Sequence, residues 1–177
     1  LYGLMTEEIN FSYEGGIYGE LIRNRTFKAD PKSAVFWTPV GGAALALDNA
    51  VPLNEALNVS LKLEASGASK AAPAGIANGG YWGIPVRPKT TYRVSFYAKT
   101  AGATVPLTVA IQSADGKTVY ASQTVKGVGG DWKQYKTTLK TGAVPLAKDN
   151  QFTLNTTMPG TIWLQQVSLF PPTVNNR

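Results

Sequence analysis

The sequence predicts a mainly β protein: an antiparallel β-sandwich of the jelly-roll kind, preceded by a short N-terminal strand–loop–helix segment. Three observations lead to this fold class. Apolar and polar residues alternate with a period of two along most of the chain after residue 33, turn-forming residues separate the alternating runs, and no helical period lies between them. Such alternation is typical of strands that have one face in the core and one in water.

The N-terminal segment has a different pattern. Leu1–Met5 is a short apolar run that predicts a buried strand, and apolar residues after Gly15-Gly16 recur at helical spacing. A strand followed by a helix normally needs further parallel strands, which the rest of the chain does not offer. We therefore expect the apolar face of this segment to pack on the sandwich or on a second copy of the chain. The residues of that face are Ile17, Leu21 and Ile22.

Period-two alternation predicts eight or nine half-buried strands in the rest of the chain. Asp115-Gly116, between two β-rich runs, indicates a tight hairpin. The predicted organisation is a truncated β–α unit over residues 1–28, a sandwich over 29–171 and a linker over 172–177. The clearest alternating runs are Val59–Ala65, Tyr92–Lys99, Leu107–Gln112 and Tyr135–Lys140.

Composition restricts the available chemistry. The 177 residues are enough for one domain with a core, and they include no cysteine and no histidine. Disulfides, thiol catalysis, serine–histidine triads and most transition-metal sites are therefore excluded. No apolar run is long enough to cross a bilayer and the chain does not open on a signal peptide, so we expect a mature or excised fragment without membrane contact.

The net charge of +6 is unevenly distributed. Residues 1–30 hold five acidic and three basic residues, whereas the remainder holds six acidic and fourteen basic ones. Nucleic-acid binding usually shows basic residues clustered with aromatic ones on one element. Here the basic residues occur singly on alternating strand positions, which predicts a solvated basic surface and no nucleic-acid partner. Examples are Lys62, Arg93, Lys99, Lys133, Lys136 and Lys140.

Several motifs resemble those of one enzyme family. Leu1–Asn10 and Gly15–Phe27 are similar to the N-terminus of family 51 α-L-arabinofuranosidases, in which a β-sandwich like carbohydrate-binding module family 4 follows directly. That sandwich carries motifs similar to Gly80-Tyr81-Trp82-Gly83-Ile84, to Tyr92–Lys99, and to the closing runs Ile162–Leu164 and Val167–Pro171. The resemblance spans nearly the whole chain.

The resemblance implies an accessory role. In the family, a catalytic (β/α)8 barrel follows this region and supplies both catalytic glutamates of a retaining glycosidase. The expected function is therefore a non-catalytic sandwich domain of an enzyme that acts on arabinose-containing plant polysaccharides. Two alternatives are an autonomous binding module for arabinoxylan or arabinan, and a fragment with residual hydrolase activity. The implied partners are the missing barrel and plant cell-wall polysaccharide, which places the protein in an extracellular or periplasmic compartment.

The resemblance also supplies candidate site residues. Glu7 matches the glutamate that binds arabinosyl hydroxyls in the parent enzyme, and we expect no catalytic residue in this chain. Aromatic rings can stack on the C–H faces of sugars, so Tyr81 and Trp82, which alternate on a predicted strand, are candidate glycan contacts. A binding module should show two or more coplanar rings on its concave face. The other candidates are Asn78, Arg87 and Tyr97.

A structural calcium ion is a further implication of the resemblance. Sandwich modules of this kind often hold calcium through backbone carbonyls and an acidic residue near the last strand. The family often has an acid after Ile162-Trp163-Leu164, but Gln165 occupies that position here. An amide brings no charge to a calcium site. We expect no cofactor and no metal ligand, with calcium left open.

Overall fold

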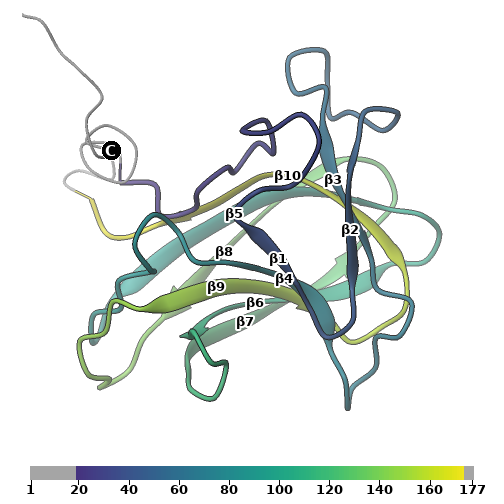
Figure 1. Ribbon diagram of the computed structural model, residues 1–177. Coiled ribbons are helices and arrows are strands. Elements are labelled where there is room, and N and C mark those ends of the chain that lie inside the picture. The colour runs from purple at the N-terminus through teal and green to yellow at the C-terminus, as the bar shows by residue number, and fades with distance from the viewer. Residues whose placement is uncertain (1–18, 174–177) are drawn as a thin grey trace, which may run out of the picture.

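The computed structural model describes residues 19–173, which form ten strands in two five-stranded antiparallel sheets (Figure 1). The first sheet has the order β1 (Trp37–Val40), β4 (Ala74–Asn78), β9 (Asn150–Thr156), β6 (Val105–Ser113), β7 (Val119–Val128). The second has the order β2 (Ala44–Asp48), β3 (Ser60–Glu64), β10 (Thr161–Phe170), β5 (Thr91–Thr100), β8 (Lys133–Lys140). The predicted antiparallel sandwich is confirmed, with one or two more strands than expected.

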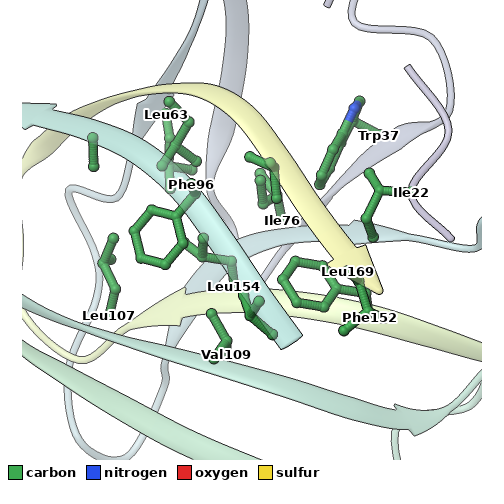
Figure 2. Packing of buried hydrophobic residues seen from close by; sticks show 14 of the residues in the cluster. Ile22, Trp37, Leu63, Ile76, Phe96, Leu107, Val109, Phe152, Leu154 and Leu169 are labelled. Atoms are coloured by element: carbon green, nitrogen blue, oxygen red, sulfur yellow. The ribbon is translucent and has the colours of Figure 1, made fainter. Parts of the chain in front are cut away.

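The period-two residues form the core between the sheets. Along β5, Tyr92, Val94 and Phe96 are buried, while the residues between them face outward. Side chains of the first sheet, including Phe152 and Leu154, meet them across the interface (Figure 2). Fully burying one such side chain contributes roughly 1.5–3 kcal/mol. Alternation in the sequence thus becomes one continuous apolar layer.

The predicted hairpin at Asp115-Gly116 is confirmed. It joins β6 to β7, with a hydrogen bond of 2.8 Å from the amide of Ser113 to the carbonyl of Thr118. Gly116 adopts a φ of +73°, a conformation that glycine accepts without steric cost. The Asp115 carboxylate accepts hydrogen bonds from the Ser113 hydroxyl and the Lys117 amide, which closes the turn.

Two segments share one side of the central strand β10. β3 pairs with its first half, from Thr161 to Leu164. Beyond that point the segment 19–27, which we call the incoming segment, runs beside β10 in its place (Figure 1). The Leu21 amide donates to Leu169 O at 3.0 Å, and the Val167 amide donates to Arg25 O at 3.2 Å. The incoming segment therefore continues the second sheet where β3 is absent.

This pairing explains why the predicted N-terminal helix is wrong over its described part. No residue from 19 to 28 is helical, because backbone groups of the segment bond across to β10 and are unavailable for bonds along a helix. A turn over residues 23–26 follows, with Asn24 at a φ of +54°. The predicted strand Leu1–Met5, and the helix residues before 19, lie outside the described residues.

The predicted packing of the incoming segment is confirmed where it can be followed. Ile22 is 1% exposed within the main core, close to Trp37 in Figure 2, and Leu21 packs against its edge. Phe27 is also fully buried, and its ring centroid lies 5.4 Å from that of Trp37. Ile17 lies outside the described residues. A domain boundary at residue 28 stays a prediction, while residues 19–27 supply core side chains to the sandwich.

Glu20 fixes the incoming segment through a buried carboxylate. The side chain is 1% exposed, and its Oε1 accepts hydrogen bonds from the amides of Ile22 and Leu169, both at 2.9 Å. Its Oε2 accepts one from the Ser168 hydroxyl at 2.6 Å and lies 3.7 Å from the Arg25 guanidinium. Burial raises the pKa of Glu20, and these donors and the arginine oppose that rise only in part.

Replacing this carboxylate should loosen the segment. Glu20→Ala leaves two buried amides and the Ser168 hydroxyl without their acceptor, so we expect a loss of about 2–4 kcal/mol in the free energy of unfolding. Glu20→Gln keeps one acceptor oxygen and should lose less than half as much. Urea denaturation of both variants beside the unmodified protein measures the difference. Equal losses for Ala and Gln would contradict a hydrogen-bonding role.

The raised pKa of Glu20 also sets a pH dependence. The folded protein holds the Glu20 proton more tightly than the unfolded chain does, so this group destabilises the fold as pH rises from about 4.3 toward the raised pKa. The unfolding free energy of the unmodified protein, taken relative to Glu20→Gln, should therefore fall between pH 4 and neutrality. Denaturation curves at several pH values check the sign, and a relative rise with pH would show it to be wrong.

Candidate functional site

The Tyr81-Trp82 pair lies in a turn directly after β4, so its expected placement on a strand is wrong. The turn runs from Gly80 to Trp82 and is closed by a 2.9 Å hydrogen bond from the Gly83 amide to Gly79 O. Gly80 and Gly83 have φ values of +64° and +89°. A Cβ on Gly83 would lie 2.0 Å from Lys148 O. These glycines reverse the chain, which alternation alone could not indicate.

The two rings form part of an exposed aromatic corner, defined by Arg23, Phe36, Tyr81 and Trp82. Trp82 is 63% exposed and Phe36 is 43% exposed. The Arg23 guanidinium carbon lies 3.7 Å from the Phe36 ring centroid and 5.8 Å from that of Tyr81. The rings of Tyr81 and Trp82 are tilted by 47°, with centroids 6.4 Å apart. The pair is therefore not the coplanar platform expected of a binding module.

Asn78 is buried and connects the segments that form this corner. It is 1% exposed, and its Oδ1 accepts hydrogen bonds from the amides of Gly80, at 2.9 Å, and Arg23, at 3.3 Å. Its Nδ2 donates to Arg23 O at 2.9 Å and to Phe36 O at 3.1 Å. One buried amide thus joins the end of β4 to the incoming segment and to the chain before β1. With all these bonds made internally, Asn78 acts as a structural residue.

The other sequence candidates lie elsewhere. Arg87 is exposed and lines a separate hollow of about 670 Å³ with Tyr120 and Leu146. Tyr97 is half-buried on the outer face of β5 in the second sheet, opposite Gln165. Glu7 lies outside the described residues. The structure therefore joins Tyr81, Trp82 and Asn78 in one place and leaves Arg87 and Tyr97 apart from them.

Arg23 and Phe36 were not predicted as site residues from the sequence. Nothing in local pattern links them, because they reach Tyr81 only through tertiary contacts. Phe36 has a φ of +71° in the structure, which is unusual for a bulky residue, but the sequence gives no sign of it. The hollow beside these residues measures about 390 Å³ and is also lined by Ile22 and Asn24.

The outer face of the second sheet gathers five of the basic residues. Alternation places them singly in sequence, but pairing of β3, β10, β5 and β8 brings these five to one side. The residues of this basic face are Lys62, Arg93, Lys99, Lys136 and Lys140. A hollow of about 680 Å³ lies at the end of this face beside Phe170. It is lined by Arg25, Arg93, Lys136 and Phe170, among others. A basic surface is thus present on this face.

Trp163 also lies on the basic face, where its side chain makes a structural hydrogen bond. Its Nε1 donates to Asp48 Oδ2 at 2.8 Å, and this hydrogen bond lowers the pKa of Asp48. The bond joins the central strand β10 to the edge strand β2 across β3. Trp37 is likewise structural, since it is buried and its Nε1 donates to Asn24 O at 3.0 Å.

The two central rows on the outer face of the first sheet hold small, uncharged side chains. Strand register places Thr38, Ala77, Thr153, Ala110 and Ser122 in one row, and Val40, Gly75, Asn155, Thr108 and Thr124 in the next. Neither row contains an aromatic ring. Two buried oxygen atoms in these rows, Thr153 Oγ1 and Asn155 Oδ1, have no hydrogen-bond partner. Both atoms are shielded from solvent, so they are not surface contacts for a ligand.

Within residues 19–173 no group of three or more acidic, cysteine or histidine side chains is arranged to bind a metal. The same stretch of chain contains no helix with the length and apolar character of a membrane crossing.

Comparison with known proteins identifies the fold. Residues 19–161 match a family model described as a carbohydrate binding domain. The chain belongs to this carbohydrate binding domain family. The match begins at Gly19, so it includes the incoming segment together with all strands up to the start of β10.

The relatives of this carbohydrate binding domain are α-L-arabinofuranosidases. Alpha-L-arabinofuranosidase 1 of Arabidopsis thaliana is 30% identical over 97% of the chain, which spans 26% of that protein. A probable α-L-arabinofuranosidase A of Aspergillus flavus is 48% identical over 49% of the chain, and the match covers 14% of that protein. The solved structure of an arabinose-bound family 51 α-L-arabinofuranosidase superposes with a TM-score of 0.84 at 34% identity. That superposition covers the whole chain and 30% of the enzyme. The resemblance seen in the sequence is confirmed.

The contrast between Asn78 and Trp82 can be tested directly. Asn78→Ala removes four internal hydrogen bonds from a buried position, so we expect it to lower the unfolding free energy by about 2–4 kcal/mol. Trp82→Ala removes a largely exposed ring and should change it by no more than about 0.5 kcal/mol. Thermal and urea denaturation measure both. A Trp82 variant that is as unstable as the Asn78 variant would show the corner to be part of the core.

Proposed function

We propose that this carbohydrate binding domain is a non-catalytic accessory domain of a larger α-L-arabinofuranosidase that acts on arabinose-containing plant polysaccharides. The observation that carries the proposal is the similarity of the whole chain to family 51 α-L-arabinofuranosidases, of which it spans about a quarter to a third. Catalysis would come from the remainder of the parent enzyme, a retaining glycosidase with both catalytic glutamates in its (β/α)8 barrel. Such an enzyme would meet its polymeric substrate in an extracellular or periplasmic compartment.

The positions of the two ends of the sandwich support an accessory role. The Gly19 backbone faces the side chains of Thr173 and Phe170, and the Arg93 guanidinium donates to the Thr173 hydroxyl at 3.1 Å. The chain therefore enters and leaves the sandwich at neighbouring points. A domain attached in this way can be joined to a parent barrel by two short linkers that lie side by side. Neither linker then crosses the rest of its surface.

Three of the described carboxylates also fit a non-catalytic role. Glycoside hydrolysis with retention needs two carboxyl groups about 5–5.5 Å apart around a bound sugar. Glu20 is buried under three internal donors, while Asp48 and Asp115 accept hydrogen bonds from Trp163 and Ser113. These contacts support a structural role for each of the three carboxylates. In the parent enzyme, Glu7 would contribute to binding the arabinosyl hydroxyls.

Glycan binding by the domain alone is the second candidate function. The exposed ring of Trp82 favours it, because such a ring can stack on the C–H face of a sugar. The absence of rings from the two central rows on the outer face of the first sheet, and the 47° tilt between Tyr81 and Trp82, favour the accessory role over this one.

Affinity electrophoresis separates these functions. We expect the mobility of the chain to stay unchanged in gels that contain arabinan, arabinoxylan or cellulose, and p-nitrophenyl arabinofuranoside to release no p-nitrophenol. Retardation by arabinan or arabinoxylan that Trp82→Ala abolishes would favour the binding module instead. Measurable p-nitrophenol release by the chain alone would overturn the accessory role.

A further inference from the structure

Gln165 occupies the point on β10 where its two neighbours meet. β3 ends its pairing with β10 at Leu164, and the incoming segment begins its own contacts just beyond. The register between β10 and β5 also shifts there, between Gln165 and Ser168, and Gln166 has a φ of +48°. Gln165 is 0% exposed. A buried polar side chain at such a break must satisfy groups that no regular strand pairing reaches.

The side-chain amide of Gln165 is fully used at this break. Its Nε2 donates both protons, one to Thr26 O at 3.2 Å and one to Val59 O. Its Oε1 accepts the Gln166 amide at 2.6 Å. Thr26 belongs to the turn of the incoming segment, and Val59 directly precedes β3. Two main-chain carbonyls from segments far apart in sequence therefore converge on one nitrogen atom.

This donor set does not fit calcium. Calcium takes six to eight oxygen ligands, usually with carboxylates among them. Here two carbonyl oxygens converge, but the group between them is an N–H donor, and the remaining oxygen of the amide is bonded to a neighbouring N–H. No group of three or more acidic side chains in residues 19–173 is placed to hold a metal ion. The chemistry present at Gln165 is that of a hydrogen-bond donor to carbonyls.

We infer that the Gln165 amide stands in place of a structural cation, so that the domain folds without calcium and keeps a latent cation site. The N–H groups supply the partial positive charge that two converging buried carbonyls require, since leaving either one unpaired is costly. The same bonds join the incoming segment, β3 and β10. A glutamate at position 165 would place a carboxylate oxygen where the amide nitrogen now lies. Three oxygens, one of them charged, would then face one point and bind a divalent cation whose remaining ligands would be water.

Thermal unfolding with and without calcium tests this inference. The unmodified protein should melt at the same temperature, within about 1 °C, in EDTA and in about 10 mM CaCl2. Gln165→Glu should melt lower than the unmodified protein in EDTA, because its carboxylate faces two carbonyls. Calcium should then raise its melting temperature by about 3–6 °C, as expected for a site with a Kd on the order of 1 mM.

Gln134→Glu is the matched control, because it makes the same change on the exposed outer face of β8. It should show no calcium dependence beyond that of the unmodified protein. Two results would overturn the inference: stabilisation of the unmodified protein by calcium, or a folded Gln165→Glu variant that calcium leaves unchanged. If that variant does not fold in either buffer, the side-chain amide signal of Gln165 in the unmodified protein decides. Slow exchange and no calcium-induced shift support the inference, and fast exchange or a shift overturns it.

Discussion

The pairing of the incoming segment with the second half of β10 is the interaction on which the rest of the structure depends. β10 is the central strand of the second sheet, yet β3 covers only its first half. Without residues 19–27, the amides of Val167 and Leu169 would lack their acceptors at Arg25 and Glu20. Unpaired buried backbone groups are rarely tolerated in a folded protein. The segment before the sandwich is therefore part of its second sheet.

The same pairing positions the aromatic corner. Holding residues 20–26 against β10 brings Arg23 within reach of Asn78 at the end of β4, and so connects the two sheets at one end. Asn78 then fixes the chain before β1 and the turn after β4. The rings that surround Arg23 lie on segments that are fixed by the buried Asn78 amide and the buried Glu20 carboxylate. Polar groups thus set the geometry of a surface whose exposed side chains are mainly aromatic.

The sequence indicated those features that depend on local pattern. Period-two alternation located the half-buried strands, and Asp115-Gly116 located the hairpin, because both are determined by neighbouring residues. The spacing of Ile17, Tyr18, Leu21 and Ile22 predicted a helix that residues 19–25 do not form. A short apolar run can bury its side chains equally well beside a strand, and only the gap left by β3 decides between the two.

Features of the candidate site were harder to predict because they arise from strand register. Lys62, Lys99 and Lys136 are far apart in sequence and share a face only because β3, β10, β5 and β8 pair in that order. Asn78 looked like a ligand contact, since a polar residue beside Tyr81 and Trp82 suits a sugar site. Its burial follows from contacts with residues 23 and 36, which no local window includes.

The arrangement of the two outer faces bears on how such a domain would sit in a parent enzyme. Gly19, Phe170 and Thr173 lie together beside the hollow that Arg93 and Phe170 line on the basic face. The connections to a barrel would therefore leave from the second sheet. The outer face of the first sheet points away from the second sheet because the core lies between them. A barrel that met the basic face would therefore leave the outer face of the first sheet uncovered. If this domain contacts a polysaccharide while attached to its enzyme, the first sheet offers the accessible surface.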